Sequence, residues 1–396
     1  MNKKLKLVMI FSSLIWLICN FHHPVTPSHF TSLGLPNHIF GTSFAMMVFT
    51  NFLTSPIWGS WGDSRSRKIV LSMSTLIYSI SQMGFSMSSS IVGIFFFRAL
   101  SGIASGGFSS GLMAAIVDTT TEENRGIAMS RYSALMLISS SLGYLVGGIL
   151  GYFPPRNVIA FQSIAMFIVS LGLWFIVGET NTNRDLHTKK KVTFVWDILK
   201  DAKKSKEVFT SWVLLFLGLT FFIHIANSSI LNAFNYYLKE ELDLKPIVNG
   251  LWKMTTGIVG LIANMTINVW IIKKQNTKSS LVGLVGIAAV CGLMIVLNSS
   301  LYQFMIWNLL FFTLISILIP ILQGFAVEGH TRDVGLMSGI YNAIKALGEV
   351  VGSMVAGLTY NISSMAPFVV STVALFIAMG FSLAGKKSQE KEIKKV

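Results

Sequence analysis

The chain has 396 residues, of which 52% are hydrophobic and only 12% are charged. A soluble domain carries about 25% charged residues, so this composition excludes an ordinary soluble protein of this size. The net charge of +14 would suit a nucleic-acid partner, but the basic residues gather between apolar stretches, which indicates membrane topology and no nucleic-acid binding.

Twelve apolar stretches are each long enough to cross a bilayer as a helix, which needs roughly 20 residues. We therefore expect an all-α polytopic membrane protein with twelve transmembrane helices in two pseudo-symmetric six-helix bundles. The predicted spans are residues 7–27, 38–58, 69–88, 91–114, 132–152, 158–178, 209–235, 249–272, 280–298, 303–326, 338–359 and 366–385.

The distribution of Lys and Arg predicts the orientation. Most of the 31 basic residues fall at the N-terminus, in alternate loops and in the C-terminal tail. Cytoplasmic loops carry such an excess, so both termini are expected in the cytosol and the chain in the cytoplasmic membrane. The predicted domains are an N-terminal bundle (1–178), a cytosolic linker (179–207), a C-terminal bundle (208–385) and a basic cytosolic tail (386–396).

Polar residues inside the spans are candidates for a cavity. His22 and His23 lie in the outer half of the first predicted span, and His224 and Asn227 lie in the middle of the seventh. Histidine titrates near neutral pH, so these side chains fit proton or substrate contact, or plain hydrogen bonding within the bundle. A metal site would need distant partners, because adjacent histidines on a helix cannot face one point, and no metal is expected. Asn51, in the second span, is a further cavity candidate or a contact between helices.

The turn after the second span holds an acid and three bases, which is more than topology needs. It reads Gly-Ser-Trp-Gly-Asp-Ser-Arg-Ser-Arg-Lys from Gly59 to Lys68, with Asp63 and Arg67 between them. A carboxylate at a helix end can hold a cation in one conformation and release it in another, so this turn can act as a gate. The predicted gate residues are those that match the family loop named below: Gly59, Asp63, Arg67 and Lys68.

Arg98 lies within the fourth span, and no acid shares that span. Its predicted partners are backbone carbonyls or a neighbouring polar group such as Gln82. Lys345 and Glu349 lie one turn apart in the eleventh span, so they share a helix face. Charged groups in hydrocarbon are costly and usually functional, so Lys345 and Glu349 are coupling candidates, and Arg98 is a functional candidate whose role the resemblance below implies. A static pair between Lys345 and Glu349 explains the same charges.

Glycines four residues apart predict close helix packing in the fifth span. These glycines are Gly143, Gly147 and Gly151, and Gly148 joins Gly143 and Gly147 as a candidate through the glycine motif of the family resemblance given below. Each half also has an acidic and basic loop after its fourth helix, which indicates an internal repeat of the kind that transporters use.

These motifs carry a resemblance to a known family. The turn from Gly59 to Lys68 resembles the signature loop of the major facilitator superfamily, G-x-x-x-D-R-x-G-R-K, with Ser64 and Ser66 as departures. Arg98-Ala-Leu-Ser-Gly102 resembles the R-x-x-x-G motif of the same superfamily, which implies a part in coupling or substrate binding for Arg98. Pro24-Val-Thr-Pro27 is similar to a motif of the twelve-helix drug:proton antiporter branch, and the fifth span matches the antiporter glycine motif in part, with Tyr144 in place of the proline.

The resemblance implies a secondary active transporter that moves a small solute by alternating access, with proton-coupled efflux of a small hydrophobic or amphiphilic compound expected. It also implies a monomer in the lipid bilayer with no cofactor. The first alternative is uptake or export of a specific neutral or anionic metabolite, since spans one to six hold no interior acid. The second is a non-transporting membrane sensor or scaffold. The sequence has no P-loop, HExxH or GxSxG motif, so we expect no enzyme activity.

Overall fold

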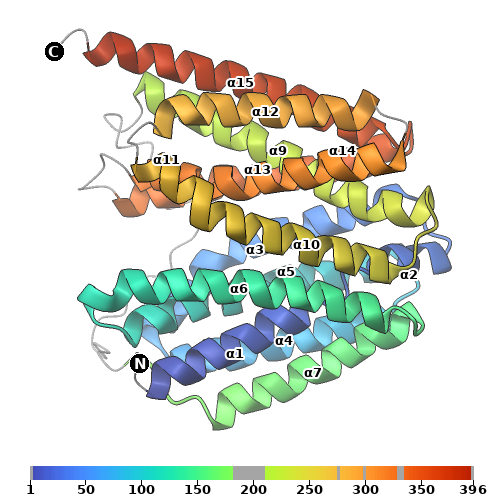
Figure 1. Cartoon of the computed structure of the whole chain (residues 1–396). Coiled ribbons are helices and arrows are strands. Elements are labelled where there is room, and N and C mark those ends of the chain that lie inside the picture. Colours follow the sequence, from blue (N-terminus) through green and yellow to red (C-terminus); the bar gives the residue numbers. More distant parts are fainter. Residues whose placement is uncertain (1–2, 182–209, 274–276, 298–299, 328–333, 394–396) are drawn as a thin grey trace. The chain divides into compact units, whose positions relative to one another are not determined.

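The computed structural model describes residues 3–181, 210–273, 277–297, 300–327 and 334–393, and within these ranges the chain forms helices and no strand. The helices labelled in Figure 1 are α1 (Lys3–Cys19), α2 (Thr26–Ser32), α3 (His38–Ser64), α4 (Arg67–Met87), α5 (Ile91–Asp118), α6 (Glu122–Leu150), α7 (Pro155–Phe175), α9 (Ser211–Glu240), α10 (Pro246–Ala263), α11 (Val269–Lys273), α12 (Thr277–Leu297), α13 (Leu301–Val327), α14 (Val334–Tyr360) and α15 (Ala366–Ile393). A π-helical turn, η2 (Asn264–Asn268), joins α10 to α11. Each predicted span coincides with one helix or with consecutive helical segments.

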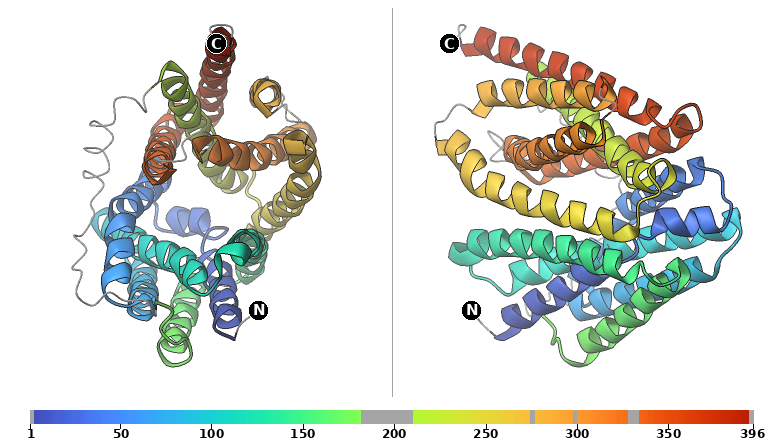
Figure 2. Two further views of the ribbon diagram at one scale, coloured as in Figure 1. Left: turned by 90° about the vertical axis from the view of Figure 1, so that its left-hand side faces the viewer. Right: turned by 45° about the vertical axis from the view of Figure 1, so that its right-hand side comes forward.

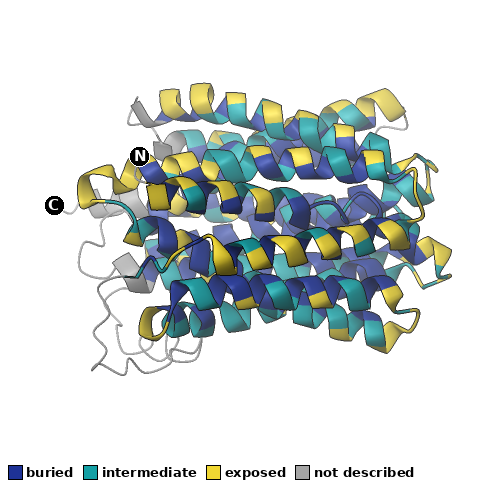
Figure 3. Ribbon diagram, turned by 90° about the horizontal axis from the view of Figure 1, so that it is seen from below, coloured by how far each residue is buried: buried dark blue, intermediate teal, exposed yellow. Residues whose placement is uncertain are grey.

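The helices have the surface that a lipid solvent requires. Nine helical stretches within the described ranges are long and apolar enough to cross a membrane. Large apolar side chains point outward along them, and Phe96 and Phe175 are 60% and 77% exposed. Figure 3 shows exposed residues recurring along helices whose other faces are buried. The chain is therefore an all-α polytopic membrane protein, as its sequence predicts.

The chain divides into two compact units. As far as these ranges are described, unit 1 comprises Met1–Ile39, Met46–Val195 and Leu238–Gly257, and unit 2 comprises Phe40–Ala45, Trp196–Tyr237 and Ile258–Val396. The predicted domain boundaries stay a prediction. Most of the predicted linker and the loop at 328–333 lie outside the described residues.

Unit 1 is organised around α4, which packs along α5 and α7, while α1 packs against α6 and α7. Both views of Figure 2 show α1, in blue, beside α7, in light green. Its core is aromatic and aliphatic: the Phe108 ring meets Trp16 and Tyr78 edge-on, among fully buried residues such as Ile15 and Leu112. In unit 2, α12 packs between α13 and α15, and α14 packs against the same two helices.

The first predicted span is broken into α1 and α2. Pro24 and Pro27 follow the end of α1 at Cys19, and a proline inside a helix removes a backbone donor and clashes with the preceding turn. The carbonyl oxygen of His22 accepts from the backbone N–H of Val25 and Thr26 instead. The break places the His22 and His23 side chains on a turn rather than on a continuous helix.

The eighth predicted span is likewise irregular. Within η2, the Asn264 amide donates to the carbonyl oxygens of Gly260 and Ser316, both at 2.9 Å. The Asn268 amide donates to the Asn264 side-chain oxygen at 3.1 Å. These side-chain bonds accompany the wider π turn, in which one extra residue fits between successive hydrogen bonds.

Candidate functional site

Arg67 ties together the ends of three helices in unit 1. Its Nη2 pairs with the Asp63 carboxylate at the end of α3, and its Nε donates to Asp118 Oδ2, at the end of α5, at 3.0 Å. Its Nη1 donates to the carbonyl oxygen of Gly59 at 3.3 Å. A Cβ atom at Gly62 would lie 2.7 Å from Nη1, so a glycine leaves the guanidinium its room. Three of the four predicted gate residues therefore meet, and Asp118 joins them.

Glu179 closes this cluster from beyond the end of α7. The backbone N–H of Arg67 donates to Glu179 Oε1 at 3.1 Å, and the Ser66 hydroxyl, at the N-cap of α4, donates to Glu179 Oε2. A carboxylate is stabilised at a helix N-terminus by the backbone donors there. Glu179 was not among the candidates. The only signal in the sequence was an acid next to a predicted span.

Lys68 lies apart from this cluster. Its ammonium group is 5.1 Å from the centre of the Trp174 ring, on α7. A lysine over an indole face makes a cation–π contact, and Trp is the strongest partner for it. Of the predicted gate residues, Lys68 is the one that the structure does not bring to Arg67.

Arg98 is buried beside a histidine rather than an acid. Its Nη1 lies 3.1 Å from His22 Nε2, and its guanidinium carbon lies 4.1 Å from the centre of the Phe85 ring. Arg98 is 2% exposed, and its Nε–H has no partner in the part of the chain that the structure describes. Gln82, the partner considered from sequence, donates to Ser101 instead.

The bonding of His22 fixes its tautomer. Arg98 has only donors, so His22 Nε2 accepts and carries no proton. A neutral imidazole then holds its proton on Nδ1, which lies 3.1 Å from the amide of Gln162. The amide atom that faces Nδ1 must therefore be the acceptor Oε1, which means that the amide of Gln162 is rotated by 180°. In the unrotated orientation, Oε1 of Gln162 is buried and has no partner among the described residues. His22 is neutral as long as it holds Arg98.

His23 belongs to a second group in unit 1. Its ring stacks on Tyr144 of α6, with centroids 5.1 Å apart, and the ammonium group of Lys253, on α10, lies 5.6 Å from the same tyrosine ring. Tyr144 occupies the proline position of the antiporter glycine motif, and here its ring carries both contacts. Lys253 was not among the candidates, although it lies inside a predicted span.

The glycines of α6 mark close helix contacts. Cβ atoms at Gly143 and Gly147 would lie 2.1 Å from the carbonyl oxygens of Leu17 and Phe21, so α1 and its following turn approach the bare backbone of α6. A Cβ at Gly148 would lie 2.9 Å from the carbonyl oxygen of Pro246, at the start of α10. Small residues permit such approach in lipid.

A charged group lies between α9 and α14 in unit 2. Glu349 Oε1 is 3.4 Å from His224 Nδ1 and 3.9 Å from Lys345 Nζ. The first distance is longer than an ordinary hydrogen bond, and neither ring nitrogen of His224 has a hydrogen-bond partner in the described part of the chain. His224 is fully buried, whereas the side chain of Glu349 is 28% exposed. Two of the predicted coupling candidates, Lys345 and Glu349, thus meet the cavity candidate His224.

A hydroxyl network holds this group in position. Ser228 and Ser353 both donate to the backbone carbonyl oxygen of Glu349, at 2.9 and 2.8 Å. The Asn232 amide donates to the Ser353 hydroxyl at 3.1 Å. Asn227, on the same helix α9, is half-buried.

Asn51 links α3 to α5. Its side-chain amide donates to the Ser105 hydroxyl at 2.8 Å, and its backbone carbonyl oxygen accepts from the Ser55 hydroxyl. This is the contact between helices considered for Asn51. In the described ranges, no three His, Cys, Asp or Glu side chains come together as a metal site would need.

Comparison with known proteins identifies the family. The model of the Major Facilitator Superfamily matches residues 7–353. The chain belongs to the Major Facilitator Superfamily. The resemblance carried by the turn from Gly59 to Lys68 is thereby confirmed. Members of this superfamily are transporters rather than enzymes, so this chain is a transporter of small-molecule solutes.

Relatives in this superfamily match nearly the whole chain. Multidrug resistance protein 2 of Bacillus subtilis is 20% identical over 366 residues, covering 92% of this chain and 91% of the relative. Quinolone resistance protein NorA of Staphylococcus aureus is 20% identical over 392 residues, covering 97% and 95%.

Solved structures match the fold. A bacterial homolog of the human lysosomal transporter Spinster, inward-facing and unoccupied, superposes with a TM-score of 0.78 at 14% identity, covering 99% of both chains. The nucleoside transporter NupG gives a TM-score of 0.76 at 12% identity, covering 98% of both. At these identities the likeness shows the fold alone.

Proposed function

We propose that this transporter is a proton-coupled exporter of a small hydrophobic or amphiphilic compound. It works as a monomer in the cytoplasmic membrane by alternating access, with both termini in the cytosol. The relatives named for multidrug and quinolone resistance support export of such compounds. The basic loops and tail support the orientation.

The observation that carries proton coupling is the group formed by Glu349, His224 and Lys345. Glu349 is the one acid inside any predicted span, and it is partly exposed between two basic partners. A proton that neutralises the carboxylate removes its attraction to Lys345, and a proton on His224 strengthens its own attraction to Glu349. Because His224 lies on α9 and Glu349 on α14, protonation at either of these two residues changes the force between the helices, which is what a coupling site needs.

The cluster around Arg67 supplies the gate. Its guanidinium holds Asp63 and Asp118 on two different helices, and Glu179 adds a contact from beyond α7. Charge-assisted hydrogen bonds of this kind are strong enough to favour one conformation of the transporter. Because they are few, they can break when the transporter adopts the other conformation. On the proposed orientation this cluster lies at the cytosolic end of unit 1.

The charges inside the spans favour a second candidate, transport of a specific neutral or anionic metabolite. Arg98, Lys253 and Lys345 lie within predicted spans, against the single acid Glu349. Buried charge without compensation is costly, so this surplus of cations disfavours a cationic cargo and suits a carboxylate or a neutral compound.

Proton flux in proteoliposomes tests the proposal. Purified protein is reconstituted with an internal pH dye, a pH gradient is imposed, and a quinolone, a lipophilic cation and an aromatic carboxylate are added in turn. We expect at least one compound to dissipate the gradient with the wild type, and the Glu349→Gln variant to lose this proton signal at least tenfold.

Glu122→Gln serves as the matched control, because Glu122 is an exposed acid at the start of α6. If a compound moves at the same rate with Glu349→Gln and with Glu122→Gln, and neither variant gives a proton signal, the chain is still a transporter. The coupling role of Glu349 is then rejected. Movement of the carboxylate alone would favour the metabolite candidate over the exporter.

A further inference from the structure

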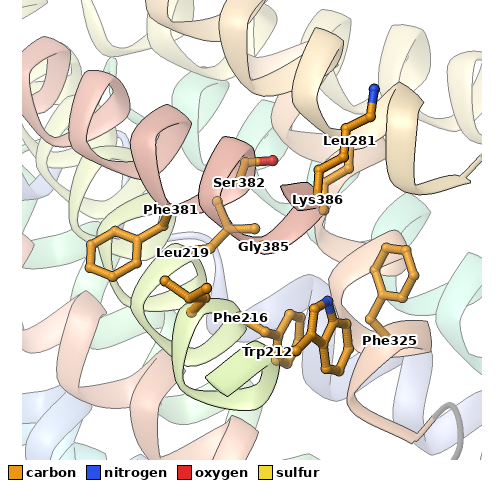
Figure 4. A pocket seen from close by; sticks show the side chains of 10 residues that line it. Trp212, Phe216, Leu219, Leu281, Phe325, Phe381, Ser382, Gly385 and Lys386 are labelled. Atoms are coloured by element: carbon orange, nitrogen blue, oxygen red, sulfur yellow. The ribbon is translucent and has the colours of Figure 1, made fainter. Parts of the chain in front are cut away.

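A hollow lies inside unit 2 between one end of α9, α12, α13 and α15 (Figure 4), and none of its lining residues belongs to the Glu349 group. Its walls are mostly carbon: Trp212, Phe216, Leu219, Phe325 and Phe381 line it. The Trp212 ring stacks on Phe216 at 5.5 Å and meets Phe325 edge-on at 6.3 Å, so these walls are held in place by one another.

Gly385 shows that the hollow is open space. Gly385 is buried, yet a Cβ atom added to it would meet nothing within 4 Å. A buried glycine in a tightly packed helix bundle normally faces a neighbour closely, as Gly147 does in unit 1. The described part of the chain therefore leaves the space beside Gly385 unfilled.

Two polar groups stand on the same stretch of α15. The Ser382 hydroxyl is buried and has no hydrogen-bond partner among the described residues, and Lys386 brings a positive charge. Figure 4 shows Lys386 and Leu281 on one side, Phe381 on another, and the rings of Trp212, Phe216 and Phe325 on a third. A ligand that fills this space needs an apolar body and an anionic, hydrogen-accepting head.

The depth of the hollow suits a lipid. The apolar stretch of α15 ends at Lys386, so this residue lies at the membrane boundary, on the cytosolic side in the proposed orientation. Phe381 lies five residues deeper, about 7.5 Å along the helix. A head group at Lys386 would thus leave an acyl chain pointing into the aromatic walls and toward the bilayer centre.

We propose that this hollow binds one anionic phospholipid of the cytosolic leaflet. Its phosphate lies at Lys386 and the Ser382 hydroxyl, and one acyl chain lies along Phe216, Leu219 and Phe381. Basic pockets between transmembrane helices on the cytosolic side recognise anionic head groups in this way. The site is separate from the proposed coupling group and does not depend on what the transporter carries.

Native mass spectrometry of the detergent-purified chain tests this site, with phosphatidylglycerol against phosphatidylcholine of the same acyl chains. We expect the wild type to retain phosphatidylglycerol preferentially. Lys386→Gln should weaken its binding about fivefold, the effect of one basic residue at a membrane surface. Gly385→Leu should abolish it by filling the hollow.

Gly380→Leu is the matched control: Gly380 lies on the same helix, is exposed, and also has nothing within 4 Å of an added Cβ. It should bind as the wild type does. Thermal melting of each variant in detergent shows that it is folded. Equal retention of both lipids, or unchanged binding in Gly385→Leu, overturns the proposal. Displacement of the lipid by millimolar inorganic phosphate or by a quinolone also overturns it, because the hollow would then be a free-anion site or part of the transport path.

Discussion

His22 Nε2 accepts a hydrogen bond from Arg98 at 3.1 Å, and this contact leaves the histidine neutral with its proton on Nδ1. His22→Phe keeps a planar ring but removes the acceptor, so Arg98 is left with a further buried donor unpaired. Leaving such a group unsatisfied costs about 1–3 kcal/mol. We expect the melting temperature in detergent to fall by several degrees.

His22→Gln retains an acceptor at this position, so we expect most of the lost stability to return. Equal melting temperatures for His22→Phe and the wild type would mean that Arg98 finds another acceptor. The role assigned to His22 would then be wrong.

The cluster around Arg67 predicts a difference between two basic residues. Lysine keeps the charge at this position but cannot bond Asp63, Asp118 and the Gly59 carbonyl together, because it lacks the planar fork of donors. We expect Arg67→Lys to lower the rate of solute exchange in proteoliposomes at least tenfold. Lys68→Arg changes a residue that faces Trp174 and should leave the rate within about twofold of the wild type, because arginine also makes cation–π contacts.

Two glycines of α6 give a matched test of helix packing. Gly147→Ala would place a methyl group 2.1 Å from the carbonyl oxygen of Phe21, so α1 and α6 would have to separate. Gly126→Ala adds the same methyl group to the same helix where nothing lies within 4 Å. We expect Gly147→Ala to reduce folded yield and melting temperature.

Gly126→Ala should be neutral or stabilising by up to about 1 kcal/mol, since alanine favours the helix. Fluorescence size-exclusion chromatography after heating measures both variants. A normal melting temperature for Gly147→Ala would show that the contact at Phe21 is not required.

Substitutions at Lys345 and Glu349 should have coupled effects on stability. Glu349→Gln leaves the Lys345 ammonium group partly buried without its carboxylate, and Lys345→Gln does the reverse. The double variant removes both charges, so it should be more stable than the sum of the single effects predicts, by about 1 kcal/mol. Thermal melting of the four proteins gives this value, and strict additivity would place the two residues in independent roles.

The sequence predicted the positions of the helices well, because an apolar stretch of the right length has few alternatives in a bilayer. It predicted the contact between Lys345 and Glu349 for a similar reason: both lie on one helix, one turn apart. Contacts between helices were harder to predict. Arg98 was expected to reach a carbonyl or Gln82, but its partner is His22, on the turn that follows α1.

The missed residues share a physical cause. Glu179 and Lys253 each contact a residue that is distant in the sequence. Glu179 accepts a hydrogen bond from the backbone of Arg67, and Lys253 lies over the ring of Tyr144. One sequence gives the faces of a helix but not the rotation of that helix against its neighbours. Unpaired charge inside a span is the one signal that would have singled out Lys253.

The π turn η2 has a consequence for the register of the helix that contains it. A π turn holds one residue more than an α-helical turn, so the segment after Asn268 is rotated by about 100° relative to an unbroken helix. Deleting a single residue from Asn264–Asn268 would restore the regular helix, and the segment after it would keep its present faces, because the π turn already takes up the extra residue. Homologous chains that lack this residue would therefore present the same faces of the helix to the same neighbours, with a one-residue gap in the alignment at the π turn.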